Sequence, residues 1–188
     1  MIDVTRDEFE RQALAHIDAL YSFALKLARS HEDAEDLVSD TFLRALERWQ
    51  QYRPGTNIRA WLFTILYHVF VSRQRRANAR EVHPYEATDQ EATLYDEPAG
   101  DLDPETRYFD SFFDNEVTRA IAALPEEYRS AVVLSDIHEM RYAEIAGVLG
   151  VPEGTVKSRL FRGRRILQKV LAGYAAAIGF LKGRSRVT

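Results

Sequence analysis

The sequence of 188 residues contains no cysteine. This absence excludes disulfide frameworks and thiolate metal sites, and it means that the protein does not need an oxidising compartment. The N-terminal stretch MIDVTRDEFERQ is too polar for a signal peptide, and no run approaches the roughly 18 apolar residues of a membrane span. We therefore expect a cytoplasmic protein with no membrane insertion.

Motifs of the common enzyme classes are also missing. The sequence has no GxxxxGK phosphate loop, and no HExxH spacing surrounds any of its five histidines. No serine, threonine or lysine stands in a convincing pair with a base. We expect no catalytic residue, no metal and no cofactor, and we predict that the protein is not an enzyme.

Charge is distributed unevenly along a chain whose net charge is −4. Residues 51–80 contain six arginines and no acidic residue, whereas residues 81–114 contain 11 acidic residues and a single arginine. Between Lys157 and Arg186 there are nine Lys or Arg and no acidic residue. Such segregation indicates separate surfaces for partners of opposite charge.

The acidic stretch 81–108 divides the chain. It has three prolines and no apolar periodicity, so it cannot bury enough surface to offset its ordering entropy. On both sides, apolar residues recur at spacings of three and four, which is typical of helices. We predict an all-α protein with two small helical domains, 1–80 and 109–188, joined by a flexible acidic linker. The predicted helices are 7–29, 32–49 (capped near Ser30), 58–76, 109–123, 126–136, 142–149 and 152–177.

The sequence YAEIAGVLGVPEGTVKSRLFRGRRIL predicts a helix-turn-helix. A short helix ends at Gly150, and a second helix follows after a few residues. One face of this second helix is expected to pack, through Val156, Leu160, Gly163, Leu167 and Val170. The opposite face carries Ser158, Phe161, Arg162, Arg165 and Lys169.

Those exposed side chains fit a DNA major groove. Arginine can donate two hydrogen bonds to guanine, serine can bond a donor or an acceptor on a base edge, and an aromatic ring can contact thymine methyls. Outlying cations would contact phosphates. The alternative is a surface helix that is basic only for solubility, against which an exposed phenylalanine among arginines argues.

Two other surfaces are predicted in the first half. In HEDAEDLVSDTFLRALERW, the side opposite the buried face carries Asp36, Asp40, Glu47 and Leu43. Carboxylates around one exposed leucine indicate docking to a basic protein, although an ordinary solvated face is equally compatible. In 51–80, aromatics beside arginines are typical of single-stranded nucleic-acid binding, although most of these rings are expected in the core. The expected contacts are the loop Arg53–Asn57 and the trailing Arg73, Arg75 and Arg76.

Four stretches together resemble the extracytoplasmic-function (ECF) sigma factors of bacterial RNA polymerase. They are DAEDLVSDTFLRAL, GTNIRAWLFTIL, LPEEYRSAVVLSDI and the helix-turn-helix above, in that order. The resemblance implies binding to core RNA polymerase, at the clamp helices of its largest subunit, and to promoter DNA. It also implies a cognate anti-sigma factor.

The resemblance implies three sets of site residues. Those that bind core polymerase are Asp33, Asp36, Leu37, Asp40, Leu43 and Glu47. Those that contact the minus-ten element are Arg53, Thr56, Asn57, Trp61, Arg73, Arg75 and Arg76. Those that contact the minus-thirty-five element are Thr155, Lys157, Ser158, Arg159, Phe161, Arg162, Arg165 and Lys169. His68 and Ser72 depart from the asparagines that relatives often carry there.

Two alternatives remain open at this point. A stand-alone helix-turn-helix regulator with an N-terminal partner- or ligand-binding domain would explain 151–167 but leave the arginine and aromatic segment unused. A nucleic-acid-processing enzyme would need carboxylates that converge on a metal.

Overall fold

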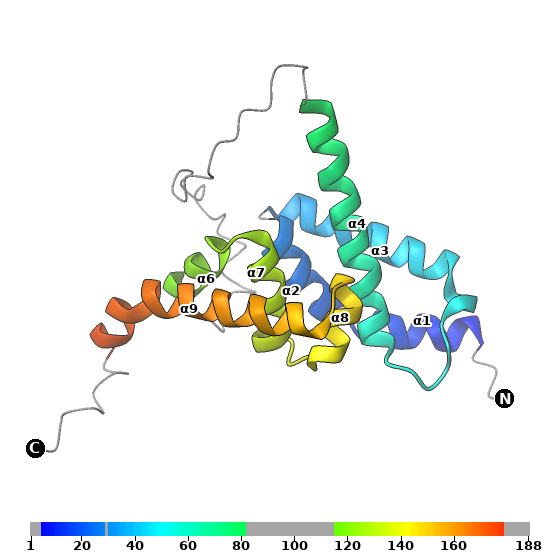
Figure 1. The fold of residues 1–188 in the computed structure, drawn as a ribbon. Helices are drawn as coiled ribbons and strands as arrows, with labels where there is room; N and C mark the ends of the chain where they lie inside the picture. The colour runs from blue at the N-terminus through cyan, green and yellow to red at the C-terminus, as the bar shows by residue number, and fades with distance from the viewer. Residues whose placement is uncertain (1–4, 29, 82–114, 179–188) are drawn as a thin grey trace, which may run out of the picture.

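The computed structural model describes residues 5–28, 30–81 and 115–178, and these are helical with short turns and contain no strand (Figure 1). The all-α prediction is therefore confirmed. Residues 82–108 of the predicted linker 81–108, and residues 109–114 of one predicted helix, lie outside the described residues, whereas Glu81 belongs to a helix. In the first half the helices are α1 (Arg6–Leu14), α2 (Ile17–Ala28), α3 (His31–Glu47), the 3₁₀ turn η1 (Trp49–Gln51) and α4 (Ile58–Glu81). In the second half they are α6 (Asn115–Ala122), α7 (Glu126–Val132), the π-helical turn η2 (Val133–Ile137), α8 (Tyr142–Leu149) and α9 (Glu153–Ala177).

The first half begins with two helices where the sequence predicted one over 7–29. Helix α1 ends at Leu14 and α2 starts at Ile17, although no glycine or proline marks the break. The break lets α1 place Phe9 against the rings of Tyr52 and Trp61, both 5.8 Å away between centroids, while α2 packs on α3. Tertiary packing thus overrides local helix propensity here.

The predicted cap of α3 is confirmed. The backbone N–H of Asp33 donates to the Ser30 hydroxyl oxygen at 3.1 Å, which satisfies one of the free donors at the helix start. The helix ends two residues earlier than predicted, and Trp49 lies in η1, partly buried. Helix α4 is five residues longer than predicted, ending at Glu81 rather than at residue 76.

The second half is organised around a buried arginine. The Arg129 guanidinium donates to the carbonyl oxygens of Ala122 at 3.0 Å and Leu124 at 3.3 Å, where α6 ends. A cation at a helix C-terminus stabilises the carbonyls that lack an intrahelical partner. This contact ties α6 to α7. The segment predicted as one helix over 126–136 widens into η2 at Val133 and so ends in a different turn geometry.

Helix α9 packs on α7 through a glycine. A Cβ on Gly163 would lie 2.8 Å from Cγ2 of Val132 and 3.3 Å from Cβ of Tyr128. The two helices therefore approach so closely that only glycine fits. Val156 and Leu160 are buried on the same face, as predicted. Val170 is 57% exposed instead of packed.

The two halves pack against each other (Figure 1). Helix α2 contacts α7 and η2, and α4 contacts α8, so one apolar core runs through both halves. The imidazole of His138 is buried at this junction, 5.9 Å from the ring of Phe23 and 4.9 Å from that of Phe63, both at steep angles. Across the described ranges, no helix is long and apolar enough to cross a membrane.

The Gly163 contact gives a test of the fold. Gly163→Ala should destabilise the protein, because overpacking costs about 1–3 kcal/mol. The better helix propensity of alanine offsets part of this cost. Gly173→Ala on the same helix is the matched control, because nothing lies within 4 Å of its added Cβ. Thermal unfolding followed by circular dichroism should show a lower Tm for the first variant and an equal or higher Tm for the second. Equal shifts for the two would contradict the close approach.

Candidate functional site

The outer face of α9 carries most of the predicted base-reading residues. Lys157, Ser158, Phe161, Arg162, Arg165 and Lys169 are all exposed. Phe161 is the most exposed of the large apolar side chains of the described residues, at 67%. An aromatic ring in water on a basic helix indicates a surface that is covered when a partner binds.

Two of the predicted residues on α9 do not belong to this face. Thr155 is half-buried in the first turn, where its carbonyl accepts the Ser158 hydroxyl at 2.9 Å. Arg159 is turned toward α7, and its guanidinium lies 3.6 Å from the Glu127 carboxylate with only 20% of the side chain exposed. In this structure Arg159 therefore makes a contact within the second half, and its contact with DNA stays a prediction.

The tight turn before α9 is set by Gly150, whose φ of 66° is in the left-handed region that favours glycine. Beside α9 lies a hollow of about 440 Å³, which reaches Tyr142 at the start of α8. Arg164 lines it and is held by Asp136, with Nε 3.1 Å from Oδ2. This ion pair raises the pKa of the Arg164 guanidinium and ties α9 to η2. Arg164 thus orients α9 against η2, a role that its position in the sequence did not reveal.

The acidic face of α3 is present, with one exception. Leu43 is 58% exposed, and Asp36 and Glu47 are exposed beside it along the helix. Asp33 is exposed at the first turn and accepts the Ser30 hydroxyl at 2.7 Å. Leu37 is only 1% exposed. Its side chain lies in the core of the first half, because it falls on the same side of α3 as the buried Ala34 and Val38, so the predicted contact with polymerase is corrected.

Asp40 and Arg73 join two surfaces that were predicted separately, the acidic face of α3 and the basic end of α4. The Arg73 guanidinium donates to the Asp40 carboxylate at 2.7 Å and to the carbonyl oxygen of Asp36 at 3.1 Å. Both side chains are partly exposed, at 36% and 42%. The ion pair fixes α4 against α3, so neither charge is fully available to an outside partner. Arg75 and Arg76, one turn further, are exposed.

The loop before α4 is held by its own hydrogen bonds. The Tyr52 hydroxyl donates to the Thr56 carbonyl at 2.8 Å, and the Thr56 hydroxyl donates to the Arg53 carbonyl at 2.7 Å. Gly55, with a φ of 84°, allows the turn. Arg53, Thr56 and Asn57 are exposed at its surface. Trp61 is only partly buried, and it packs on Phe9 and Tyr52, so its ring is mainly a structural contact.

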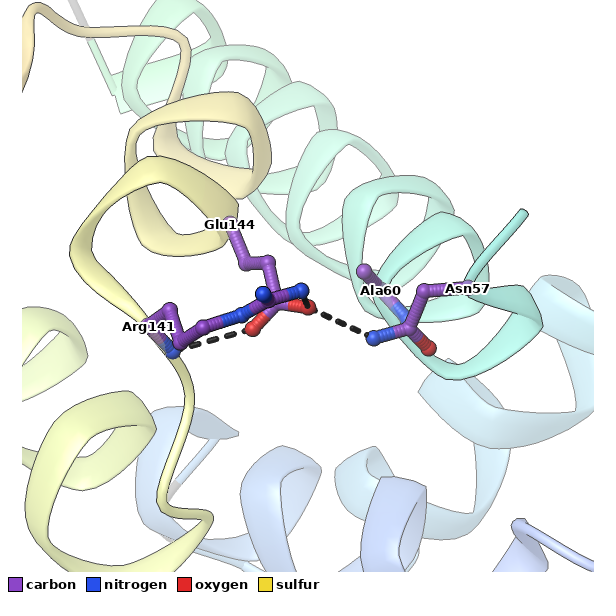
Figure 2. A network of polar contacts seen from close by, with 4 residues as sticks. All are labelled: Asn57, Ala60, Arg141 and Glu144. Atoms are coloured by element: carbon purple, nitrogen blue, oxygen red, sulfur yellow. Dashed lines mark hydrogen bonds and ion pairs between the residues drawn. The ribbon is translucent and has the colours of Figure 1, made fainter.

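Asn57 is in contact with both halves of the protein (Figure 2). Its Oδ1 accepts the backbone N–H of Ala60 at 3.2 Å and caps α4, and its Nδ2 donates to Oε1 of Glu144 on α8 at 2.7 Å. Glu144 also accepts the Arg141 backbone N–H at 2.9 Å and its guanidinium at 3.0 Å. The hydrogen bonds from Arg141 and then from Asn57 lower the pKa of Glu144 to about 2. The carboxylate is therefore ionised at neutral pH.

Carboxylates do not converge on a metal position in the part of the chain that the structure describes, where no group of three metal-ligating side chains occurs. The convergence that a metal-dependent nuclease would need is thus missing from those residues.

Comparisons with known proteins agree with this arrangement. Residues 13–80 match sigma-70 region 2, and residues 114–167 match sigma-70 region 4. The ECF RNA polymerase sigma factor SigE of Mycolicibacterium smegmatis is 40% identical over 171 residues, which are 90% of this chain and 63% of that protein. The chain thus spans less than two thirds of the length of SigE.

Two further relatives are matched over most of their length. The ECF RNA polymerase sigma factor EcfG of Rhodopseudomonas palustris is 33% identical over 165 residues, covering 88% of this chain and 86% of that protein. The solved structure of the sigma factor RpoE from Bartonella quintana, in complex with the anti-sigma factor NepR, is similar with a TM-score of 0.65 and 30% identity. That match covers 88% of this chain and 97% of the other. The chain therefore belongs to the ECF RNA polymerase sigma factors and carries the two sigma-70 regions that support promoter-directed initiation of transcription.

Proposed function

We propose that the first half binds core RNA polymerase and opens the minus-ten element, while α9 of the second half reads the minus-thirty-five element. The observation that carries the proposal is the outer face of α9, the second helix of the helix-turn-helix. On this face an exposed phenylalanine lies among exposed basic side chains. A stand-alone regulator would not require the match of residues 13–80 to sigma-70 region 2.

For polymerase docking, we assign Leu43 with Asp36 and Glu47 on α3. The leucine supplies apolar area, and the surrounding carboxylates steer the encounter with a basic surface. The clamp helices of the largest subunit are the partner that the family resemblance implies. Asp40 contributes less, because Arg73 already neutralises it.

For the minus-ten element, we assign Arg75 and Arg76 on α4 together with the loop residues Arg53, Thr56 and Asn57. Exposed cations beside an exposed loop suit a strand whose bases are unstacked. The protein acts by binding in this scheme and performs no catalysis of its own, and the assignment implies a cytoplasmic location. A cognate anti-sigma factor is the expected regulator, since the similar RpoE structure is a complex with one.

The docking surface is tested by Leu43→Ala combined with Glu47→Arg. These changes should weaken binding to core polymerase by at least tenfold without lowering the Tm, because both side chains are exposed. Leu14→Ala is the matched control, since Leu14 is 56% exposed on α1 and away from this face. Fluorescence titration with core polymerase measures the affinities. Unchanged affinity for the double variant would remove α3 from the docking site.

The minus-ten assignment is tested by Arg75→Ala, with Gln74→Ala as the control on the neighbouring exposed position. Arg75→Ala should reduce promoter opening more than formation of the closed complex, since its proposed partner strand is exposed only after melting. Permanganate reactivity of minus-ten thymines reports opening, and gel mobility reports the closed complex. Equal losses in the two steps would assign Arg75 to duplex binding instead.

The minus-thirty-five assignment is tested by comparing Arg162→Ala with Lys169→Ala in the complex with core polymerase. Arg162 lies two turns closer to the start of α9, where side chains reach base edges, so its loss should cost about 1–3 kcal/mol and relax preference at one base pair. Lys169→Ala should weaken binding to all sequences and reduce its salt dependence. Binding to promoters with cognate and scrambled elements, measured across a salt series, separates the two. A uniform loss for Arg162→Ala would leave it only a phosphate contact.

A further inference from the structure

Helix α7 lies against α9, the helix assigned to the minus-thirty-five element, and the approach is close (Figure 1). Tyr128 packs where Gly163 leaves room, since a Cβ on the glycine would lie 3.3 Å from Cβ of Tyr128. Gly163 follows Arg162 directly, and it lies about one helical turn after Arg159. Glu127 and Tyr128, in the first turn of α7, therefore lie beside the two arginines of α9.

The two glutamates at the start of α7 have different partners. The Glu126 carboxylate accepts the Ser130 hydroxyl at 2.7 Å and the Tyr67 hydroxyl at 3.2 Å, so its hydrogen bonds go to α7 itself and to α4. The Glu127 carboxylate lies 3.6 Å from the guanidinium of Arg159 on α9. Only 20% of the Arg159 side chain is exposed, compared with 49% of the Glu127 side chain. The pair thus keeps one cation of α9 turned toward α7.

Arg162 is exposed on the outer face of α9, yet it also has neighbours on α7. Contact with the Tyr128 hydroxyl, and then the charge of Glu127, raise the pKa of the Arg162 guanidinium. An arginine held by a neighbouring group loses less side-chain entropy when it binds a base. The guanidinium has more N–H donors than one hydroxyl can accept, so it can still donate two hydrogen bonds to guanine. The contact therefore orients Arg162 without blocking it.

We propose that Glu127 and Tyr128 of α7 are positioning residues for DNA recognition. The carboxylate of Glu127 keeps Arg159 away from the DNA phosphates, and the hydroxyl of Tyr128 orients Arg162 toward a base edge. The minus-thirty-five contact predicted for Arg159 is then not made while Glu127 holds it. Sequence preference depends on Tyr128, and the electrostatic, sequence-independent part of the affinity depends on Glu127. The inference rests on the proposed function for the assignment of α9 to the minus-thirty-five element.

Tyr128→Phe tests the first role, because it removes the hydroxyl and keeps the ring that packs on Gly163. In the complex with core polymerase, discrimination should fall by about two- to fivefold at the base pair whose preference Arg162→Ala relaxes, with an unchanged Tm and salt dependence. The loss should vanish when Arg162→Ala is already present, since the hydroxyl acts through that guanidinium. Affinities for promoters with each base pair at that position measure the effect. Unchanged discrimination, or an equal loss in the Arg162→Ala background, would overturn the role of Tyr128.

Glu127→Gln tests the second role, because it removes the charge and keeps the shape of the side chain. Arg159 can then contact a phosphate, so affinity for cognate and scrambled promoters should rise by the same factor, and the slope of log K against log salt should steepen by about 0.9. Adding Arg159→Ala should abolish the rise. Glu116→Gln on α6 is the matched control, since Glu116 is similarly exposed, at 54%, and pairs with Arg119 of its own helix. A rise that persists with Arg159→Ala, or that the control reproduces, would overturn the role of Glu127.

Failure of this inference and failure of the proposed function give different results. If Arg162→Ala leaves discrimination unchanged at every position of the element, the assignment of Arg162 to a base is wrong, and the role of Tyr128 falls with it. If Arg162→Ala relaxes discrimination and Tyr128→Phe does not, the assignment of α9 to the minus-thirty-five element stands, and the positioning role of Tyr128 is wrong.

Discussion

The enclosure of His138 by rings from the other half is the contact on which the arrangement of the molecule depends. The π-helical turn η2 delivers this imidazole to the junction, and Phe23 and Phe63 enclose it. Burial, and then the nearby guanidinium of Arg59, lower its pKa to about 4. Separated halves would expose the imidazole and return its pKa toward the ordinary 6.5. The separated state therefore binds the proton more readily, and closure loses stability as pH falls from about 6.5 toward 4.

Charged side chains make two kinds of contact, those that join helices within one half and those that join the two halves. At the surface, ion pairs such as that of Arg73 with Asp40 join helices within one half and contribute modestly to stability. At the junction, Glu144 accepts bonds from its own helix start and from Asn57, so a single carboxylate organises α8 and also bridges the halves. Because one carboxylate makes both contacts, the start of α8 is linked directly to the loop before α4.

Helix boundaries with local signals were predictable from the sequence, and those set by tertiary contacts were not. The Ser30 cap and the Gly150 turn use backbone chemistry that specific residue types supply, and both occur where they were predicted. The break between α1 and α2 follows from aromatic packing with Tyr52 and Trp61, which no local pattern encodes. The site residues divide in the same way. The outer face of α9 follows from helical periodicity, whereas the inward positions of Leu37 and Arg159 depend on neighbouring helices.

The junction itself escaped prediction because its members look ordinary one at a time. His138 is one of five histidines without a motif, and Asn57 was predicted as a loop residue that contacts DNA, with no sign of a partner in the other half. Their significance arises only when α4 and α8 lie side by side, since the donor of one half then meets the acceptor of the other (Figure 2). A hydrogen bond between exposed groups is worth about 1 kcal/mol, so the polar contacts between the halves add modestly to the apolar core that runs through both.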